Sequence, residues 1–138
     1  MPEQLTVLVV DDDCEIVTAA TLRLRAAGYL TQTACDGESG VAVAAEYHPD
    51  AILLDVRMPR MDGLTALKEL KRRDDTKSIP VVMLSASIVD QQAALEAGAR
   101  FFLKKPYGGD ALLRAISSAL EQPVELQPAS LSQAIYKD

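Results

Sequence analysis

Short apolar runs alternate along the chain with segments whose apolar residues recur at helical spacing. The runs expected to form strands are Leu5–Val10, Leu30–Ala34, Ala51–Leu54, Ile79–Leu84 and Phe101–Leu103. The expected helices are a first one carrying Val17, Ala20, Leu24 and Ala27 on one face and stopping at Gly28, then Gly37–Tyr47, Gly63–Arg73, Val89–Ala97 and Ala111–Glu121. This alternation predicts a doubly wound α/β domain whose parallel sheet is covered on both faces. The half-polar run Leu30–Ala34 suits an edge of that sheet, because central parallel strands are apolar throughout.

The helical pattern stops near residue 121, which divides the 138 residues in two. We expect one domain over residues 1–121 and a C-terminal tail or linker stub over 122–138, because Pro123 ends the last helix. No apolar stretch reaches the roughly 18 residues of a membrane span, and the N-terminus lacks the pattern of a secretory signal. The two cysteines cannot build a disulfide framework, so the expected location is the cytoplasm.

The net charge of the chain indicates which binding partners to expect. The chain has 14 basic and 20 acidic residues, a formal charge of −6, with no basic run. This balance predicts no direct binding of nucleic acid, because phosphate backbones are bound by clustered Lys and Arg.

Charged and hydroxyl side chains directly follow the apolar strands. Asp11, Asp12 and Asp13 follow the first strand, Asp55 the third, Ser85 the fourth, and Lys105 the fifth. Because the carboxyl ends of parallel strands share one edge, these groups are expected to meet in a single crevice. Three carboxylates facing one ammonium would leave a residual negative charge, which favours a divalent cation. Oxygen ligands with open positions are typical of Mg²⁺ sites that also accept phosphate.

Each of these residues also has a simpler explanation. Asp13 could be only a helix N-cap, and Asp12 with Glu15 could form a capping box. Asp55 could be a turn residue before Met58 and Pro59. The functional interpretation rests on the combination of these residues, since separate strand ends each carry a group that one phosphoryl-transfer site needs.

Several motifs in order resemble the receiver domain of two-component response regulators. They are Val9–Asp13, Leu54–Pro59, Met61–Gly63, Leu84–Ala86, Ala97–Ala99 and Lys105–Pro106, and the resemblance covers about residues 5–121. It implies a flavodoxin-like sheet with strand order 2-1-3-4-5 and five helices. It also implies a signalling protein that accepts a phosphoryl group. Such a protein is not an enzyme acting on other substrates, because it catalyses only its own phosphorylation and autodephosphorylation.

The resemblance assigns roles to individual residues. Asp55 would be the phosphoacceptor. Mg²⁺ would be bound directly by Asp12 and Asp55, largely through water by Asp11, and by the backbone carbonyl of Arg57. The Lys105 ammonium would contact the phosphoryl oxygens as a point charge.

A switch is implied by the same resemblance. Ser85 would donate its hydroxyl to the phosphoryl group and vacate space near the fourth strand, and the Phe102 ring would turn inward to fill it. The implied partners are a sensor histidine kinase or histidine phosphotransfer protein and a downstream protein target, with the chain a monomer or a weak phosphorylation-dependent dimer.

Some positions tune or depart from the family pattern. Arg57 and Ser87 lie where the family sets the lifetime of the acyl phosphate. Gly108 and Gly109 replace a polar cap before the fifth helix, which predicts a looser loop. The family tends to have the Lys105–Pro106 bond cis, and we expect it here.

Three other functions make different demands on these positions. A haloacid-dehalogenase-like Mg²⁺-dependent phosphatase would want a second Asp at position 57, where this chain has Arg. A flavodoxin-type electron carrier would need a Ser-, Thr- or Gly-rich phosphate loop after the first strand, where Asp11, Asp12 and Asp13 stand. A phosphate-independent docking receiver would not need the acceptor residues, which are all present.

Overall fold

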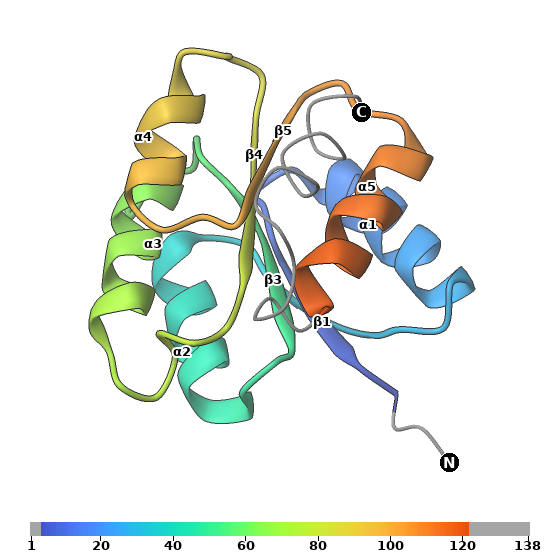
Figure 1. Ribbon diagram of the computed structural model, residues 1–138, viewed down its shortest axis with the longest axis horizontal. Coiled ribbons are helices and arrows are strands. Elements are labelled where there is room, and N and C mark those ends of the chain that lie inside the picture. The colour runs from blue at the N-terminus through green and yellow to red at the C-terminus, as the bar shows by residue number, and fades with distance from the viewer. Residues whose placement is uncertain (1–3, 122–138) are drawn as a thin grey trace.

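A five-stranded parallel sheet forms the centre of the molecule, with helices on both faces (Figure 1). The computed structural model describes residues 4–121, and the expected tail over 122–138 lies outside them. The strands are β1 (Thr6–Val10), β2 (Leu30–Ala34), β3 (Ala51–Asp55), β4 (Val81–Ser85) and β5 (Phe101–Lys104). The helices are α1 (Cys14–Ala26), α2 (Gly37–Tyr47), α3 (Gly63–Arg72), α4 (Asp90–Glu96) and α5 (Gly109–Leu120).

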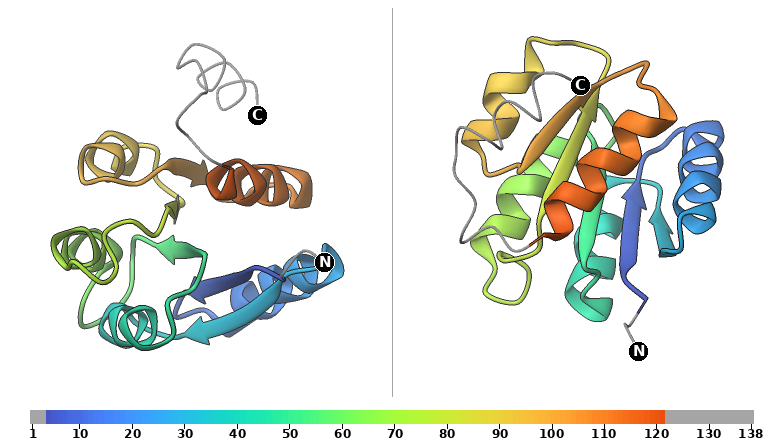
Figure 2. Two further views of the ribbon diagram at one scale, coloured as in Figure 1. Left: turned by 60° about the horizontal axis from the view of Figure 1, so that its bottom comes forward. Right: turned by 45° about the vertical axis from the view of Figure 1, so that its right-hand side comes forward.

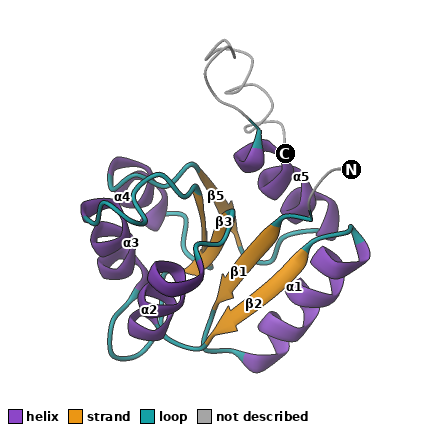
Figure 3. Cartoon of the chain, turned by 90° about the horizontal axis from the view of Figure 1, so that it is seen from below, coloured by secondary structure: helices purple, strands orange, loops and turns teal. Residues whose placement is uncertain are grey.

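The strand order is β2-β1-β3-β4-β5 with every pair parallel, which confirms the expected topology. The half-polar β2 lies at an edge, as its sequence predicted. Helices α1 and α5 cover one face of the sheet, and α2, α3 and α4 cover the other (Figures 2 and 3).

Alternation along the central strands supplies both halves of the core. On β1, Leu8 and Val10 pack with the cluster under α2, α3 and α4, whereas Val7 and Val9 pack with the cluster under α1 and α5. All four side chains are at most 1% exposed. This two-sided burial explains why the strand sequence shows no polar alternation, as is usual for parallel sheets.

Several boundaries differ from the sequence prediction by one or two residues. Strand β4 begins at Val81 rather than Ile79, because Pro80 has no N–H for the ladder, although its carbonyl accepts from the Ile52 N–H at 3.0 Å. Strands β3 and β4 each extend one residue further than expected, to Asp55 and Ser85. Both functional candidates are therefore fixed by the sheet itself.

The start of α1 decides between two explanations of the acidic triplet. Asp13 is the N-cap, and its side chain accepts from the Glu15 and Ile16 N–H groups at 2.9 and 3.4 Å. The capping-box pairing of Asp12 with Glu15 is therefore wrong, since that box would require Asp12 at the N-cap. Asp12 is left without a capping role in α1.

None of the helices within residues 4–121 is long and apolar enough to cross a membrane.

Candidate functional site

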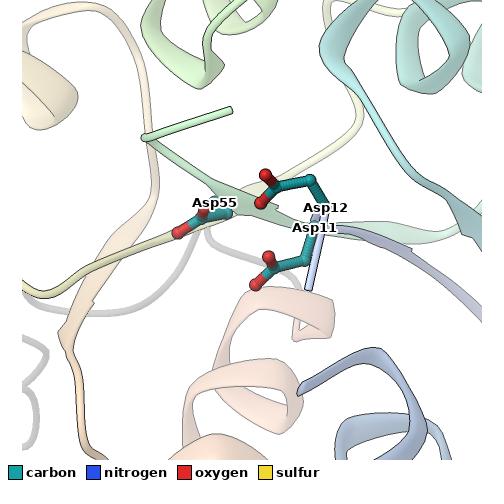
Figure 4. Close-up of side chains that lie close together, drawn as sticks. All are labelled: Asp11, Asp12 and Asp55. Carbon is teal, nitrogen blue, oxygen red and sulfur yellow. The ribbon is translucent and has the colours of Figure 1, made fainter. Parts of the chain in front are cut away.

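Three carboxylates meet at the carboxyl edge of the sheet. Asp11 and Asp12 directly follow β1, and Asp55 is the last residue of β3. One ligand atom from each lies within 4.8 Å of the others. Figure 4 shows the three side chains directed toward a common space. The sequence prediction that these residues meet is thus reproduced by the fold.

Lys105, after β5, bridges two of the three carboxylates. Its Nζ lies 2.9 Å from Asp55 Oδ1 and 3.1 Å from Asp11 Oδ2. The Lys105 backbone N–H donates to the Ser85 carbonyl at 2.8 Å, which ties the end of β5 to the end of β4. The Lys105–Pro106 peptide bond is cis, as expected from the sequence. The two ion pairs hold the ammonium between the buried carboxylates of Asp11 and Asp55.

Burial sets the proton affinities at this site. Asp11 and Asp55 are 1% and 4% exposed, whereas Asp12 is exposed. Burial raises the pKa of both the Asp11 and the Asp55 carboxyl, and hydrogen bonds from Asp13 N–H and Lys105 offset only part of that effect. Burial also opposes the charge on Lys105, but the two carboxylates outweigh it and raise the Lys105 pKa. The protein alone therefore leaves this cluster short of positive charge.

The donor set fits a hard divalent cation. It offers three carboxylates against one ammonium, with no sulfur or imidazole among them. Asp12 is exposed and gives the cluster an open side, which suits an ion that keeps some of its waters. Asp11, Asp12 and Asp55 could therefore hold a divalent metal ion, which would supply the missing positive charge.

Ser85 is close to this cluster in the sheet but is engaged elsewhere. It follows Leu84, the register partner of Asp55 on the neighbouring strand. Its fully buried hydroxyl donates to Asp90 Oδ2 at 2.6 Å and accepts from the Ser87 N–H at 3.1 Å. The fold thus brings Ser85 to the carboxyl edge of the sheet, while its hydroxyl donates to Asp90 at the start of α4.

Asp90 is the functional candidate that the sequence analysis missed. It is the first residue of α4 and is 8% exposed. Besides the Ser85 hydroxyl, it accepts from the Arg57 guanidinium, with Nε at 3.3 Å from Oδ2 and Nη2 at 3.2 Å from Oδ1. The only signal in the sequence is an acidic residue in the first turn of a helix, where Asp is common for local reasons.

Phe102 and Gly108 complete the set of predicted positions. The Phe102 ring is 8% exposed and packs in the core cluster on the α4 side of the sheet, so its role as a switch stays a prediction. Gly108 is the N-cap of α5 and makes no side-chain cap, as its sequence predicted.

The fold and site together define a receiver-type domain. A family model described as the response regulator receiver domain matches residues 7–117. The chain belongs to this family, and the resemblance seen in the sequence is confirmed.

Relatives of known kind support this assignment. RpaA of Synechocystis sp., a DNA-binding dual master transcriptional regulator, is 35% identical over 90% of this chain and 52% of its own length. The transcriptional regulatory protein PrrA of Mycobacterium tuberculosis is 43% identical over 73% of this chain and 43% of its own length. The chain thus spans about half the length of the curated relatives that it matches.

These relatives correct one expectation. The prediction of no nucleic-acid partner is wrong for this group of proteins, because RpaA is itself a DNA-binding regulator. The match covers the receiver region alone. The net charge of −6 describes these 138 residues, and it says nothing about the DNA contacts of longer relatives such as RpaA.

Solved structures show the same fold. A response regulator from Chloroflexus aurantiacus aligns with a TM-score of 0.84 at 34% identity, over 87% of this chain and all of that one. The chemotaxis protein CheY4 of Vibrio cholerae gives a TM-score of 0.80 at 32% identity, over 86% of this chain and 100% of its own. The receiver domain of sensor histidine kinase PA1611 from Pseudomonas aeruginosa, solved with a magnesium ion in its active-site cleft, gives 0.79 at 29% identity, over 86% and 98%.

Proposed function

We propose that this chain accepts a phosphoryl group on Asp55 from the phosphohistidine of a histidine kinase, and that residues 1–121 form the phosphoacceptor domain. The observation that carries the proposal is the position of Lys105, which bridges Asp55 and Asp11 beside the exposed Asp12. A site built only for stability would not bury two carboxylates under a single ammonium.

The proposed step is an in-line displacement at phosphorus. A carboxylate oxygen of Asp55 attacks, the P–N bond of the donor breaks, and the imidazole nitrogen leaves with the electron pair. The Lys105 ammonium lies 2.9 Å from Asp55 Oδ1. It would therefore contact the oxygens of the transferred phosphoryl group and neutralise their charge. The product is an acyl phosphate at the end of β3.

A bound Mg²⁺ would neutralise negative charge on both the carboxylates and the phosphoryl oxygens. We propose that Asp12 and Asp55 hold it directly, Asp11 largely through water, and the Arg57 backbone carbonyl as a further ligand. Ser85 would donate its hydroxyl to the phosphoryl group once it is bound.

Turnover is limited in this proposal to the chain's own phosphorylation and dephosphorylation. A dehalogenase-like phosphatase would need an acid at position 57, and Arg57 is instead paired with Asp90. A docking module independent of phosphate gives no reason for the Lys105 bridge.

The proposal is tested by intact-protein mass spectrometry. We expect acetyl phosphate with Mg²⁺ to add a single phosphoryl group that hydroxylamine removes, because acyl phosphates react with this nucleophile. Excess EDTA should suppress the addition, since the acidic cluster then lacks its counter-charge. An unmodified protein under saturating donor and Mg²⁺ would overturn the proposed function.

The metal assignment gives a separate prediction. We expect Asp12→Asn to weaken Mg²⁺ binding by about tenfold or more, because a ligand carboxylate is lost. Asp13→Asn is the matched control: it removes the same charge one residue away, and Asn also caps α1 well. Calorimetric titration with MgCl₂ compares the two variants. Equal losses in both would show a general effect of charge and would exclude Asp12 as a ligand.

A further inference from the structure

The hydrogen bonds of Asp90 connect the segment after β3 with the end of β4. Arg57 belongs to the segment after β3, and Ser85 ends β4, yet both donate to the carboxylate of Asp90 at the start of α4. In Figure 1 the connection after β4 leads directly into α4. The three residues form a chain of contacts that runs from two residues beyond Asp55 to the first turn of α4.

The Ser85 hydroxyl can serve only one strong acceptor at a time. A hydroxyl carries a single O–H donor, and here it is given to Asp90 at 2.6 Å. A hydrogen bond to a charged carboxylate in a buried site is among the stronger ones in proteins. Donation to a phosphoryl group on Asp55 therefore requires that the bond to Asp90 be broken.

We propose that Asp90 is a positioning residue that holds the Ser85 hydroxyl away from Asp55, so that the phosphorylated state forms only at the cost of this bond. The inference rests on the proposed function, because it needs a phosphoryl group at Asp55. The Arg57 guanidinium lies within 3.3 Å of Asp90, so the buried carboxylate would keep a partner when Ser85 leaves.

The consequence for α4 follows from the same contacts. Asp90 is the first helical residue, and it is held by Arg57 from the segment after β3 and by Ser85 at the end of β4. Release of Ser85 removes one of these ties and leaves the exposed Arg57 as the other, which loosens the start of α4. Phosphorylation would thus be transmitted to α4 through Asp90.

The test is a double-mutant cycle on Ser85 and Asp90, read out by the affinity for beryllofluoride, a stable analogue of the phosphoryl group, in the presence of Mg²⁺. We expect Asp90→Ala to bind it about tenfold more tightly than wild type, because the competing hydrogen bond is gone. Ser85→Ala should then cost about tenfold more affinity in the Asp90→Ala background than in the wild-type background.

A purely structural Asp90 gives a different result. Equal costs of Ser85→Ala in both backgrounds, or weaker binding by Asp90→Ala, would overturn the inference. Asp110→Ala is the matched control, because it removes an exposed acidic residue from the first turn of α5 and should leave the affinity unchanged.

A second variant covers the case in which Asp90→Ala does not fold. Asp90→Asn keeps the size and an acceptor oxygen but weakens the bond from Ser85, and an affinity gain of about threefold supports the inference. No gain in a folded Asp90→Asn protein contradicts it. If wild type itself neither binds beryllofluoride nor takes up a phosphoryl group, it is the proposed function that fails.

Discussion

The Asp55→Asn variant is expected to gain no phosphoryl group from acetyl phosphate and Mg²⁺, a complete loss of the modification. An amide oxygen is a far poorer nucleophile than a carboxylate, and this substitution removes the only acceptor that Lys105 contacts at the end of β3. Intact mass spectrometry of the variant beside wild type measures the result.

The matched control is Asp74→Asn, which makes the same chemical change at an exposed carboxylate paired with Lys77. This variant should be modified as fully as wild type. A stable phosphoprotein from Asp55→Asn, or a loss of modification in Asp74→Asn, would contradict the assignment of Asp55. Asn at position 55 keeps the size of the side chain, so the variant is expected to fold. Thermal unfolding of both variants verifies this.

The second large effect concerns the backbone that carries the acceptor. Gly63, the first residue of α3, packs so closely on β3 that an added Cβ would overlap the Asp55 carbonyl and approach the Val56 Cα at 2.8 Å. The Gly63 N–H also donates to the Val56 carbonyl at 2.7 Å, which fixes this approach. Because strand backbone cannot give way as a flexible side chain does, Gly63→Ala is expected to lower the free energy of unfolding by about 3 kcal/mol.

Urea unfolding followed by circular dichroism measures this change, with Gly108→Ala as the control. Gly108 has no heavy atom within 4 Å of its added Cβ, so its substitution should change the free energy of unfolding by less than about 0.5 kcal/mol. Comparable stabilities for the two variants would show that the α3–β3 contact can relax. The phosphorylation of Gly63→Ala should also fall, since Asp55 is carried by the displaced strand.

The hydrophobic pattern alone predicted most of the architecture. The central strands and α2 were placed within two residues, because two-sided burial leaves a continuous apolar run and an amphipathic helix leaves a period near 3.6. The half-polar composition of β2 was sufficient to place it at the sheet edge. The differences of one or two residues lie at the ends of strands and helices alike: Pro80 delays the start of β4, ladder hydrogen bonds carry β3 through Asp55, and α5 begins at Gly109 rather than Ala111.

Sequence by itself determined which groups reach the carboxyl edge of the sheet, because the identity of the residue after each strand is local information. The sequence alone therefore predicted that Asp11, Asp12, Asp55 and Lys105 lie close together, as they do in the structure. Only the tertiary structure decided what each side chain bonds to. The distances from Ser85 and Arg57 to Asp90 depend on how the loops after β3 and β4 fold onto α4, and no periodicity encodes that packing.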